Sequence, residues 1–489
     1  MSSELWIEKC GIGWGQAKIN IVVDLYAFAC GCYLFSSIFT AATVDFHCEP
    51  LTSSFYRNKC LKNCSSYAYS QEMSTIFSEY DLACGRDHVY YSFLQNIFFV
   101  GYIVGGIIAP FVQNRCGRKG PIYLSAFLFN IVTVVTLFTE DIYGFELGHF
   151  LSGVAFSVFN NSGTLLTVEF VDKSYRTFFA IMYWMAFGTS GIFTTIVAYI
   201  FRHSWRLQLF VFYPILNVLV IAAYFYIPES PRWLLSKKRF RDAATVFQKL
   251  AFDNNIEISD DCLDQIEKEF SNEEISSMFS FWKTLRELFH SRQAITSTLI
   301  STYLWGIGNG LYFALILDRE ALSGNIYINY ILIALVDLSS FFYIFLVKKF
   351  SRKRICESLL LVAALMLLIT PLVGEIDYVS NVLAVVAKMC SAVFANAFYA
   401  LQPETLPVRI RASGMAYFEI VSRIIVVLFI SIIHLNTVSI NIPILIYGSS
   451  AFVGLLLLHF GIPNLDFRQL PDTTEHVLNG SKLNVQKYS

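Results

Sequence analysis

Charged residues are scarce in this chain. Asp, Glu, Lys and Arg make up 15% of its 489 residues, whereas a soluble chain of this length carries roughly a quarter. Too few charges remain to cover a large water-exposed surface, which argues against an ordinary soluble globular protein. The formal net charge is −1, so there is no overall electrostatic attraction to nucleic acid.

The chain also lacks the short motifs of common enzymatic chemistry. It has no Gly-x-Ser-x-Gly, no His-Glu-x-x-His and no phosphate-binding loop. Its 8 histidines are scattered without the spacing of metal ligands. We therefore expect neither a membrane enzyme, such as an acyltransferase, nor a metal or other cofactor.

Long apolar blocks dominate what is present. The chain is 55% hydrophobic, and its mean hydropathy is +0.53. A membrane helix needs about 20 mostly apolar residues, because its backbone must satisfy its own hydrogen bonds in lipid. These blocks predict an all-α membrane protein with twelve transmembrane helices in two six-helix halves. The predicted spans lie near 19–44, 90–112, 120–139, 143–168, 177–200, 206–227, 293–317, 326–347, 355–373, 380–401, 412–434 and 442–463.

The basic residues predict the orientation of these spans. Most of the 36 Lys and Arg residues fall on one side of them, and such residues favour the cytoplasmic side. The first apolar run is too long for a signal peptide and has no clear cleavage site, so we expect it to remain as a span. The predicted parts are a cytoplasmic N-terminus (1–18), an N-terminal half (19–227), a cytoplasmic linker (228–292), a C-terminal half (293–463) and a cytoplasmic tail (464–489). In the linker, amphipathic spacing predicts short surface helices near 230–251, 262–270 and 279–289.

The first outer loop, 45–89, carries four of the 11 cysteines. They are Cys48, Cys60, Cys64 and Cys84. An even number in an extracellular loop predicts two disulfides, whose pairing the sequence leaves open, with unpaired cysteines as the alternative. Asn63 begins an Asn-Cys-Ser sequon and is a candidate glycosylation site.

Several local motifs recur in the two halves. Asn114–Lys119 follows the second span, and the similarly basic Lys348–Arg354 follows the eighth. Matching loops of this kind indicate an internal repeat, although solvated basic loops alone would look the same. Further motifs are Pro-Glu-Ser-Pro-Arg-Trp-Leu-Leu at 228–235, Glu-Thr-Leu-Pro at 404–407, Leu-Pro-Asp-Thr at 470–473 and Gly-Asn-Ile-Tyr-Ile-Asn at 324–329.

Together these motifs resemble the organic cation, carnitine and organic anion transporters of the major facilitator superfamily. The resemblance covers essentially the whole chain. It implies the major facilitator fold and a plasma-membrane protein. It also implies secondary transport by alternating access, with the substrate near the bilayer midplane between the halves. A coupling ion, sodium or proton, is not indicated.

Charged residues at the cytoplasmic helix ends are candidates for a gate, because ion pairs there can close the inner mouth and break on rocking. They are Arg115, Arg118, Glu169, Arg176, Glu229, Arg232, Glu404 and Arg411. Asn114 and Lys348 stand where the family usually has Asp, which would loosen such a gate. A non-transporting sensor or scaffold that keeps the carrier fold therefore remains an alternative.

Charged side chains within spans are costly in lipid and are candidates for substrate contact. They are Asp24, Asp337, Lys388, Glu419 and Arg423, besides His149. The alternative for each is an ion pair between helices, or simple packing for His149. Asp337 matches an acidic position that the family places near its substrate, and Lys388 matches a lysine that recurs in the family. At Arg423 the cation branch has Asp, and the anion and carnitine branches have Arg.

The remaining candidates are mostly aromatic. Trp305 and Tyr312 are seven positions apart on one helix face, and Tyr33, Asn160 and Trp184 lie in spans that the superfamily uses for binding. Aromatic faces bind quaternary ammonium groups, and a guanidinium binds carboxylate, although any one ring can simply pack. An acid, an arginine and aromatic walls together favour a zwitterion such as carnitine or a betaine. Organic anions come next, and an organic cation is the further alternative.

Overall fold

The computed structural model describes residues 2–462, with gaps at 50–59, 61–63, 65, 85–86, 173–174, 223–226, 258–261, 271–285, 318–324, 348, 374–376, 403–405, 407–410, 434, 436–438 and 440. Its contacts divide the chain into two compact units. Unit 1 comprises Met1–Glu273 and Gly324–Leu338, and unit 2 comprises Glu274–Ser323 and Ser339–Ser489. The predicted boundaries of the two halves remain a prediction.

Eleven stretches in the described part of the chain are long and apolar enough to cross a membrane, and each overlaps a predicted span. The sixth predicted span, 206–227, coincides with helix α8 (Trp205–Ala222), some of whose side chains lie outside the described residues. The all-α membrane fold is thus confirmed, and the count of twelve spans remains a prediction.

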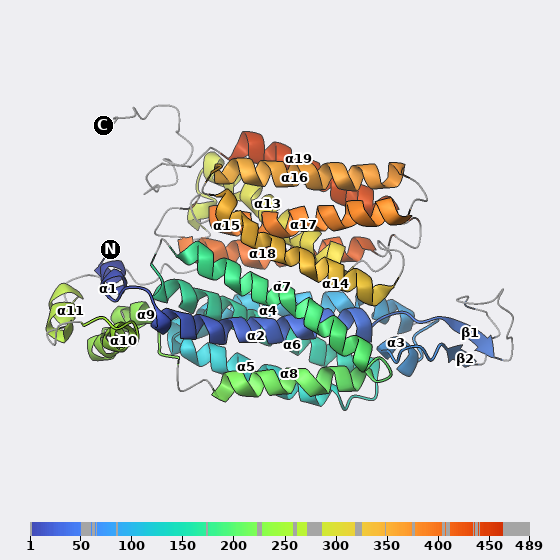
Figure 1. Cartoon of the computed structure of the whole chain (residues 1–489), viewed down its shortest axis with the longest axis horizontal. Coiled ribbons are helices and arrows are strands. Elements are labelled where there is room, and N and C mark those ends of the chain that lie inside the picture. The colour runs from blue at the N-terminus through green and yellow to red at the C-terminus, as the bar shows by residue number, and fades with distance from the viewer. Residues whose placement is uncertain are drawn as a thin grey trace. The chain divides into compact units, whose positions relative to one another are not determined.

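Unit 1 contains the elements from α1 to α11, together with α14 (Figure 1). Its elements are α1 (Ser2–Lys9), α2 (Trp14–Thr40), β1 (Phe46–Glu49), β2 (Ser66–Tyr69), α3 (Ile76–Glu79), α4 (Asp87–Cys116), α5 (Lys119–Thr136), α6 (Ile142–Phe170), α7 (Arg176–Ile200), α8, α9 (Pro231–Ser236), α10 (Phe240–Asp253), α11 (Cys262–Phe270) and α14 (Ile326–Asp337).

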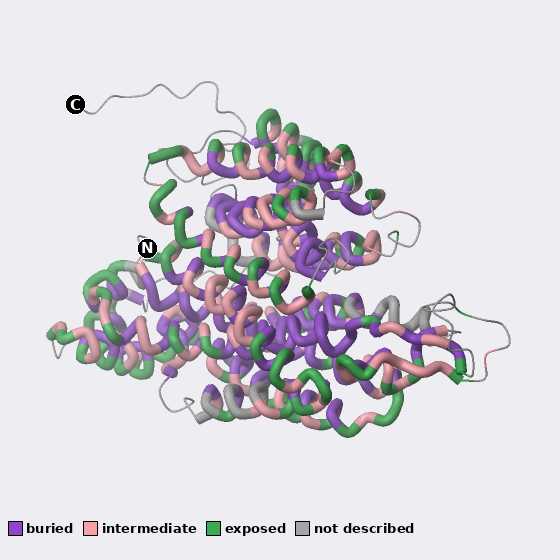
Figure 2. The backbone as a smooth tube through the Cα atoms, turned by 45° about the vertical axis from the view of Figure 1, so that its right-hand side comes forward, coloured by how far each residue is buried: buried purple, intermediate pink, exposed green. Residues whose placement is uncertain are grey.

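Small residues bring the helices of unit 1 into close contact. Gly101 and Gly105 of α4 lie against the α6 backbone, and Gly31 of α2 lies against Ser190 of α7. In lipid, helices associate through such close packing rather than by excluding water. The outward faces carry exposed apolar residues, such as Val135 and Ile200, at 60% and 63% exposure. Figure 2 shows exposed residues on the outer helices and buried ones inside.

The outer loop is a small disulfide-linked structure. β1 and β2 pair antiparallel, with Phe46 opposite Tyr69 and Glu49 opposite Ser66. The structure joins Cys48 to Cys64 and Cys60 to Cys84, which resolves the pairing that the sequence left open. Asn63 lies outside the described residues.

At the opposite end of α2, the N-terminal segment is docked on the linker helices (Figure 1). Trp6 of α1 lies 5.9 Å from Phe247 of α10, between ring centroids. The Asn254 amide donates to the Cys10 and Gly11 carbonyls at 3.0 and 3.2 Å. α9, α10 and α11 occupy the first two amphipathic stretches predicted for the linker, whereas most of 279–289 lies outside the described residues.

Unit 2 contains the other helices that are given bounds here, of which η3 begins at the last residue of unit 1. They are α13 (Arg292–Leu317), η3 (Leu338–Phe341), α15 (Phe342–Leu346), α16 (Arg352–Ile369), η4 (Thr370–Leu372), α17 (Asp377–Leu401), α18 (Arg411–Ile432) and α19 (Asn441–Gly461). Three glycines of α13 allow its neighbours to approach. Gly308 faces Phe394 of α17, and Gly306 and Gly310 face Ile425 and Phe429 of α18.

Candidate functional site

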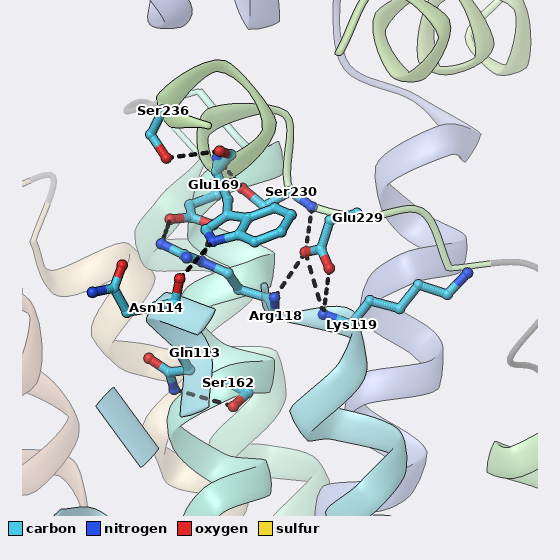
Figure 3. Close-up of polar contacts among 10 residues, drawn as sticks. Gln113, Asn114, Arg118, Lys119, Ser162, Glu169, Glu229, Ser230 and Ser236 are labelled. Carbon is cyan, nitrogen blue, oxygen red and sulfur yellow. Dashed lines mark hydrogen bonds and ion pairs between the residues drawn. The ribbon is translucent and has the colours of Figure 1, made fainter. Parts of the chain in front are cut away.

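A buried ion pair lies beside the turn between α4 and α5 (Figure 3). Arg118 donates from Nε and Nη2 to the two carboxylate oxygens of Glu169 on α6, at 3.0 and 2.8 Å. Both residues are buried, at 4% and 5% exposure. Gly117 adopts φ +80°, a left-handed conformation that glycine tolerates best. This turn places Arg118 at the start of α5. Two parallel charge-assisted bonds make a strong and well-oriented contact.

Glu229 binds the same turn from the other side (Figure 3). One of its carboxylate oxygens accepts hydrogen bonds from the backbone N–H groups of Arg118 and Ser230, both at 2.8 Å. Lys119 N–H also points to the carboxylate, at 3.3 Å. The N–H groups of Arg118 and Lys119 lie at the start of α5. The N-terminus of a helix favours negative charge. We call Arg118, Glu169 and Glu229 the α4–α5 turn network.

The other predicted gating residues differ in their surroundings. Arg115 is exposed, and Arg232 is half-buried at the start of α9. Arg176 donates to the Val171 carbonyl at 3.4 Å. Glu404 and the side chain of Arg411 lie outside the described residues.

In unit 2, Arg423 of α18 is held in an ion pair. Its Nη2 lies 3.0 Å from Glu419 Oε2 one turn earlier on the same helix. Its Nη1 donates to the side-chain oxygen of Asn309 on α13 at 3.3 Å. Arg423 is 2% exposed. The sequence raised an ion pair between two helices as the alternative for these residues, whereas the pair in the structure lies within one helix.

Aromatic rings connect this pair to Lys388 of α17. The Lys388 ammonium lies 4.9 Å from the Tyr312 ring centroid, and the Arg423 guanidinium lies 5.4 Å from that of Phe313. These adjacent rings are in edge contact, with centroids 5.0 Å apart. We call Asn309, Lys388, Glu419 and Arg423, with these two rings, the charged cluster of unit 2.

Trp305 lies two turns before Tyr312 on α13. Its ring centroid is 5.5 Å from Tyr399 and 6.0 Å from Phe398, both on α17. Phe418 of α18 is the third neighbour, at 6.5 Å. Trp305 is buried, so it packs three helices together, and its buried indole Nε1 has no partner within the described chain.

Two polar pairs tie the helices of unit 1. His149 Nδ1 and the Tyr33 hydroxyl are 3.0 Å apart, and the His149 ring stacks on Phe145. Asn160 donates to the Tyr102 hydroxyl at 2.6 Å and accepts from that of Tyr183 at 2.5 Å. Asn160 thereby links α4, α6 and α7, which is a structural role that the sequence did not reveal.

The last two predicted residues of unit 1 belong to α7 and α14. Trp184 is half-buried, with its ring 5.9 Å from that of Phe187. Asp337 is buried at the end of α14. It lies directly against Gly188 of α7, where an added Cβ would be 2.6 Å from the Asp337 Cβ.

Sequence reasoning missed the contacts that tie the outer loop to the helices. Glu79 of α3 binds the Trp205 indole and Arg206 at the start of α8. Arg206 also donates to the Thr139 carbonyl at 2.8 Å, and Tyr80 donates to it at 3.1 Å. Burial raises the pKa of Tyr80 above its ordinary value, so the phenol remains a donor. These partners are far apart in sequence and carry no shared motif.

A similar link near the second basic loop was also missed. Lys353 donates to the His459 carbonyl at 2.8 Å, and the His459 ring lies 3.1 Å from Glu357.

Among the residues that the structure describes, no group of three His, Cys, Asp or Glu is arranged to hold a metal ion.

Comparisons with known proteins place this geometry in a family. The profile described as sugar (and other) transporter matches residues 10–475. An organic cation transporter protein of Drosophila melanogaster is 26% identical, over 90% of this chain and 81% of its own. Organic cation/carnitine transporter 2 of Rattus norvegicus is 27% identical, over 85% and 74%. The human protein of that name is 26% identical, over 84% and 73%.

The fold is also similar to that of solved transporters. The xylose transporter XylE of E. coli, in a partially occluded inward-open conformation, matches with a TM-score of 0.68. The match covers 94% of this chain and 100% of that one at 15% identity. At this identity the similarity establishes the fold alone. With a family profile that spans nearly its whole length and the fold of a major facilitator protein, the chain belongs to the sugar (and other) transporter family of the major facilitator superfamily.

Proposed function

We propose that this chain is a plasma-membrane carrier that moves small organic ions by alternating access. Its preferred substrates are zwitterions with a carboxylate and a quaternary ammonium, such as carnitine or a betaine, followed by organic anions. Family membership supports a carrier, and relatives described as organic cation/carnitine transporters support the substrate type.

We infer the substrate class from the presence of both positive and negative side chains in the charged cluster of unit 2. Arg423 and Lys388 supply cations, which attract a carboxylate. Glu419 supplies an anion, and the nearby aromatic faces attract a quaternary ammonium, at about 0.5–2 kcal/mol per contact. A zwitterion complements both charge signs, whereas a simple anion or cation complements one.

The pairing of Arg423 with Glu419 sets a condition on binding. A substrate carboxylate has to share the guanidinium with the Glu419 carboxylate, 3.0 Å away. Arg has five N–H donors in a rigid planar fork, so it can serve both partners if the substrate approaches a different edge. Glu419 then weakens the binding of plain anions through like-charge repulsion and strengthens the binding of an ammonium group.

The α4–α5 turn network is proposed to hold one end of unit 1 closed during part of the cycle. Its bonds join α5, α6 and the segment before α9. A buried ion pair is stable only with good geometry, so a small movement of α5 against α6 breaks it cooperatively. Such a contact suits a two-state switch.

The test is competitive uptake into proteoliposomes that contain the full chain. Labelled carnitine, an aromatic carboxylate and tetraethylammonium are compared in the wild type, Arg423→Asp and Glu419→Gln. We expect the wild type to prefer carnitine. Arg423→Asp shifts preference to the cation, and Glu419→Gln improves the anion relative to carnitine.

Two results would contradict this proposal. A wild type that prefers tetraethylammonium, with no change in Arg423→Asp, would remove the role of Arg423 and favour an organic cation transporter, as one Drosophila relative is described. No uptake of any of the three above empty vesicles would favour a sensor or scaffold with this fold.

A further inference from the structure

Helix α2 carries an acidic residue inside its apolar span. Asp24 lies in the candidate span Trp14–Thr40, where a carboxylate is costly. Asn20 precedes it by four residues, so the two side chains share one helix face. The Asn20 amide nitrogen donates to Asp24 Oδ2 at 2.5 Å. Asn20 is 5% exposed, and Asp24 is half-buried.

The second Asp24 oxygen and the only side-chain oxygen of Asn20 have no hydrogen-bond partner among the described residues. Asp24 Oδ1 and Asn20 Oδ1 are both buried, and neither makes a hydrogen bond within the described chain. Lys18, the nearest cation along α2, is paired with Asp253 of α10 instead. The ionic form of Asp24 would therefore leave two buried acceptors unsatisfied, one of them charged.

The helices packed against α2 offer no described cation to Asp24. Arg206 of α8 binds Glu79 at the outer loop, and Arg176 of α7 donates to Val171. Glu169 of α6 is paired with Arg118. The remaining ionisable side chains described on α2, α6 and α7 are Tyr26, Cys30, Cys32, Tyr33, Tyr143, Glu146, His149, Tyr183 and Tyr199, and those described on α10 are Arg241, Asp242, Lys249 and Asp253. On α5, which Tyr26 contacts, they are Lys119 and Tyr123. Within the described chain, Asp24 forms a hydrogen bond or ion pair with none of them.

A single proton on Asp24 would supply the donor that these two acceptor oxygens lack. Protonated at Oδ1, Asp24 becomes a donor, and a carboxylic acid and a primary amide pair through two hydrogen bonds. The amide N–H donates to one acid oxygen, and the acid O–H donates to the amide oxygen. A metal cation would need more oxygen ligands than the two found here. We propose that Asp24 and Asn20 form a proton-binding site, occupied in the conformation described.

The proton comes from water and returns to it, with the carboxylate and the carboxylic acid as the two forms of Asp24. If the chain is the carrier proposed above, movement of α2 that brings Asp24 to water releases the proton and couples its flow to transport. This second step rests on the proposed function, whereas proton binding does not.

Infrared spectroscopy of the full chain in liposomes tests proton binding directly. We expect a protonated-carboxyl C=O band at neutral pH that is lost in Asp24→Asn and retained in Glu146→Gln, a control at another half-buried acid in a span. Asn20→Ala keeps the carboxyl but removes the amide donor, so the band moves to higher wavenumber. This variant also serves if Asp24→Asn fails to elute as a folded protein. An unchanged spectrum in both Asp24→Asn and Asn20→Ala would overturn the proposal.

Uptake of carnitine with and without an inward proton gradient tests the coupling. The wild type is expected to respond to the gradient, and the ratio of the two rates falls to one in Asp24→Asn. An equal gradient response in both proteins would overturn coupling at Asp24. If the infrared band is lost in Asp24→Asn but the wild type shows no uptake, the proton site is supported and only the carrier function is refuted.

Discussion

Arg115 and Arg118 lie three positions apart in one basic loop, yet they have different environments. Arg115 is exposed, whereas Arg118 is 4% exposed and bonded to Glu169. The sequence pattern assigned both to a gate, because it shows charge at helix ends but not burial. The partner of Arg118 lies 51 positions away, and no local spacing predicts it. In contrast, Glu419 and Arg423 have the i,i+4 spacing that favours an ion pair on one helix, so that contact could be predicted.

The buried pair predicts a strong coupling in stability. Arg118→Leu or Glu169→Leu alone leaves an unpaired buried charge, which costs about 3–5 kcal/mol. The double variant removes both charges, so its loss should be well below the sum of the two. Thermal unfolding of the purified protein, followed by tryptophan fluorescence, measures all three.

The matched control for this cycle is Arg115→Leu, three residues away in the same loop. Because Arg115 is exposed, its change should stay within roughly 0.5 kcal/mol. Additive losses from Arg118→Leu and Glu169→Leu, or a loss in Arg115→Leu as large as in Arg118→Leu, would argue against a buried pair.

At the scale of helices, the span map was predictable because the bilayer fixes the length and polarity of a helix that crosses it. The ends were less predictable. The eighth span was predicted as continuous over 326–347, but α14 ends at Asp337 and the tighter turn η3 follows. Short 3₁₀ turns depend on local packing rather than hydropathy. No sequence pattern indicates that Asp337 lies against Gly188.

The contact between Gly188 and Asp337 predicts how adding one methyl group at Gly188 changes stability. Gly188→Ala places a Cβ 2.6 Å from the Asp337 Cβ, and overpacking of this kind costs about 1–3 kcal/mol. Gly120→Ala in α5 meets only an ordinary contact, 3.5 Å from the Cys116 Cβ. We expect Gly188→Ala to lower the melting temperature and Gly120→Ala to leave it unchanged or slightly higher, since alanine favours helix. Equal melting temperatures would show that α14 does not pack on α7 at Asp337.

For the whole molecule, the fold class and family were predictable because both rest on features spread along the chain: apolar blocks, repeated loops and motifs. The cysteine pairing was not, since four cysteines allow three connectivities. The role of Asn160 in linking three helices could not be predicted either, because its partners Tyr102 and Tyr183 come from two other helices. Asn160 was predicted as a binding residue because it lies in a span that the superfamily uses for binding. Its contacts with two other helices became visible only in the structure.

Counterflow in proteoliposomes tests the carrier claim most directly. Vesicles that contain the full chain are loaded with unlabelled carnitine and diluted into labelled carnitine, and the label inside is followed over time. An alternating-access carrier predicts a transient accumulation of label above its outside concentration, absent from empty vesicles. Label that only equilibrates, or never enters beyond the empty-vesicle level, would contradict a carrier that exchanges carnitine across the membrane.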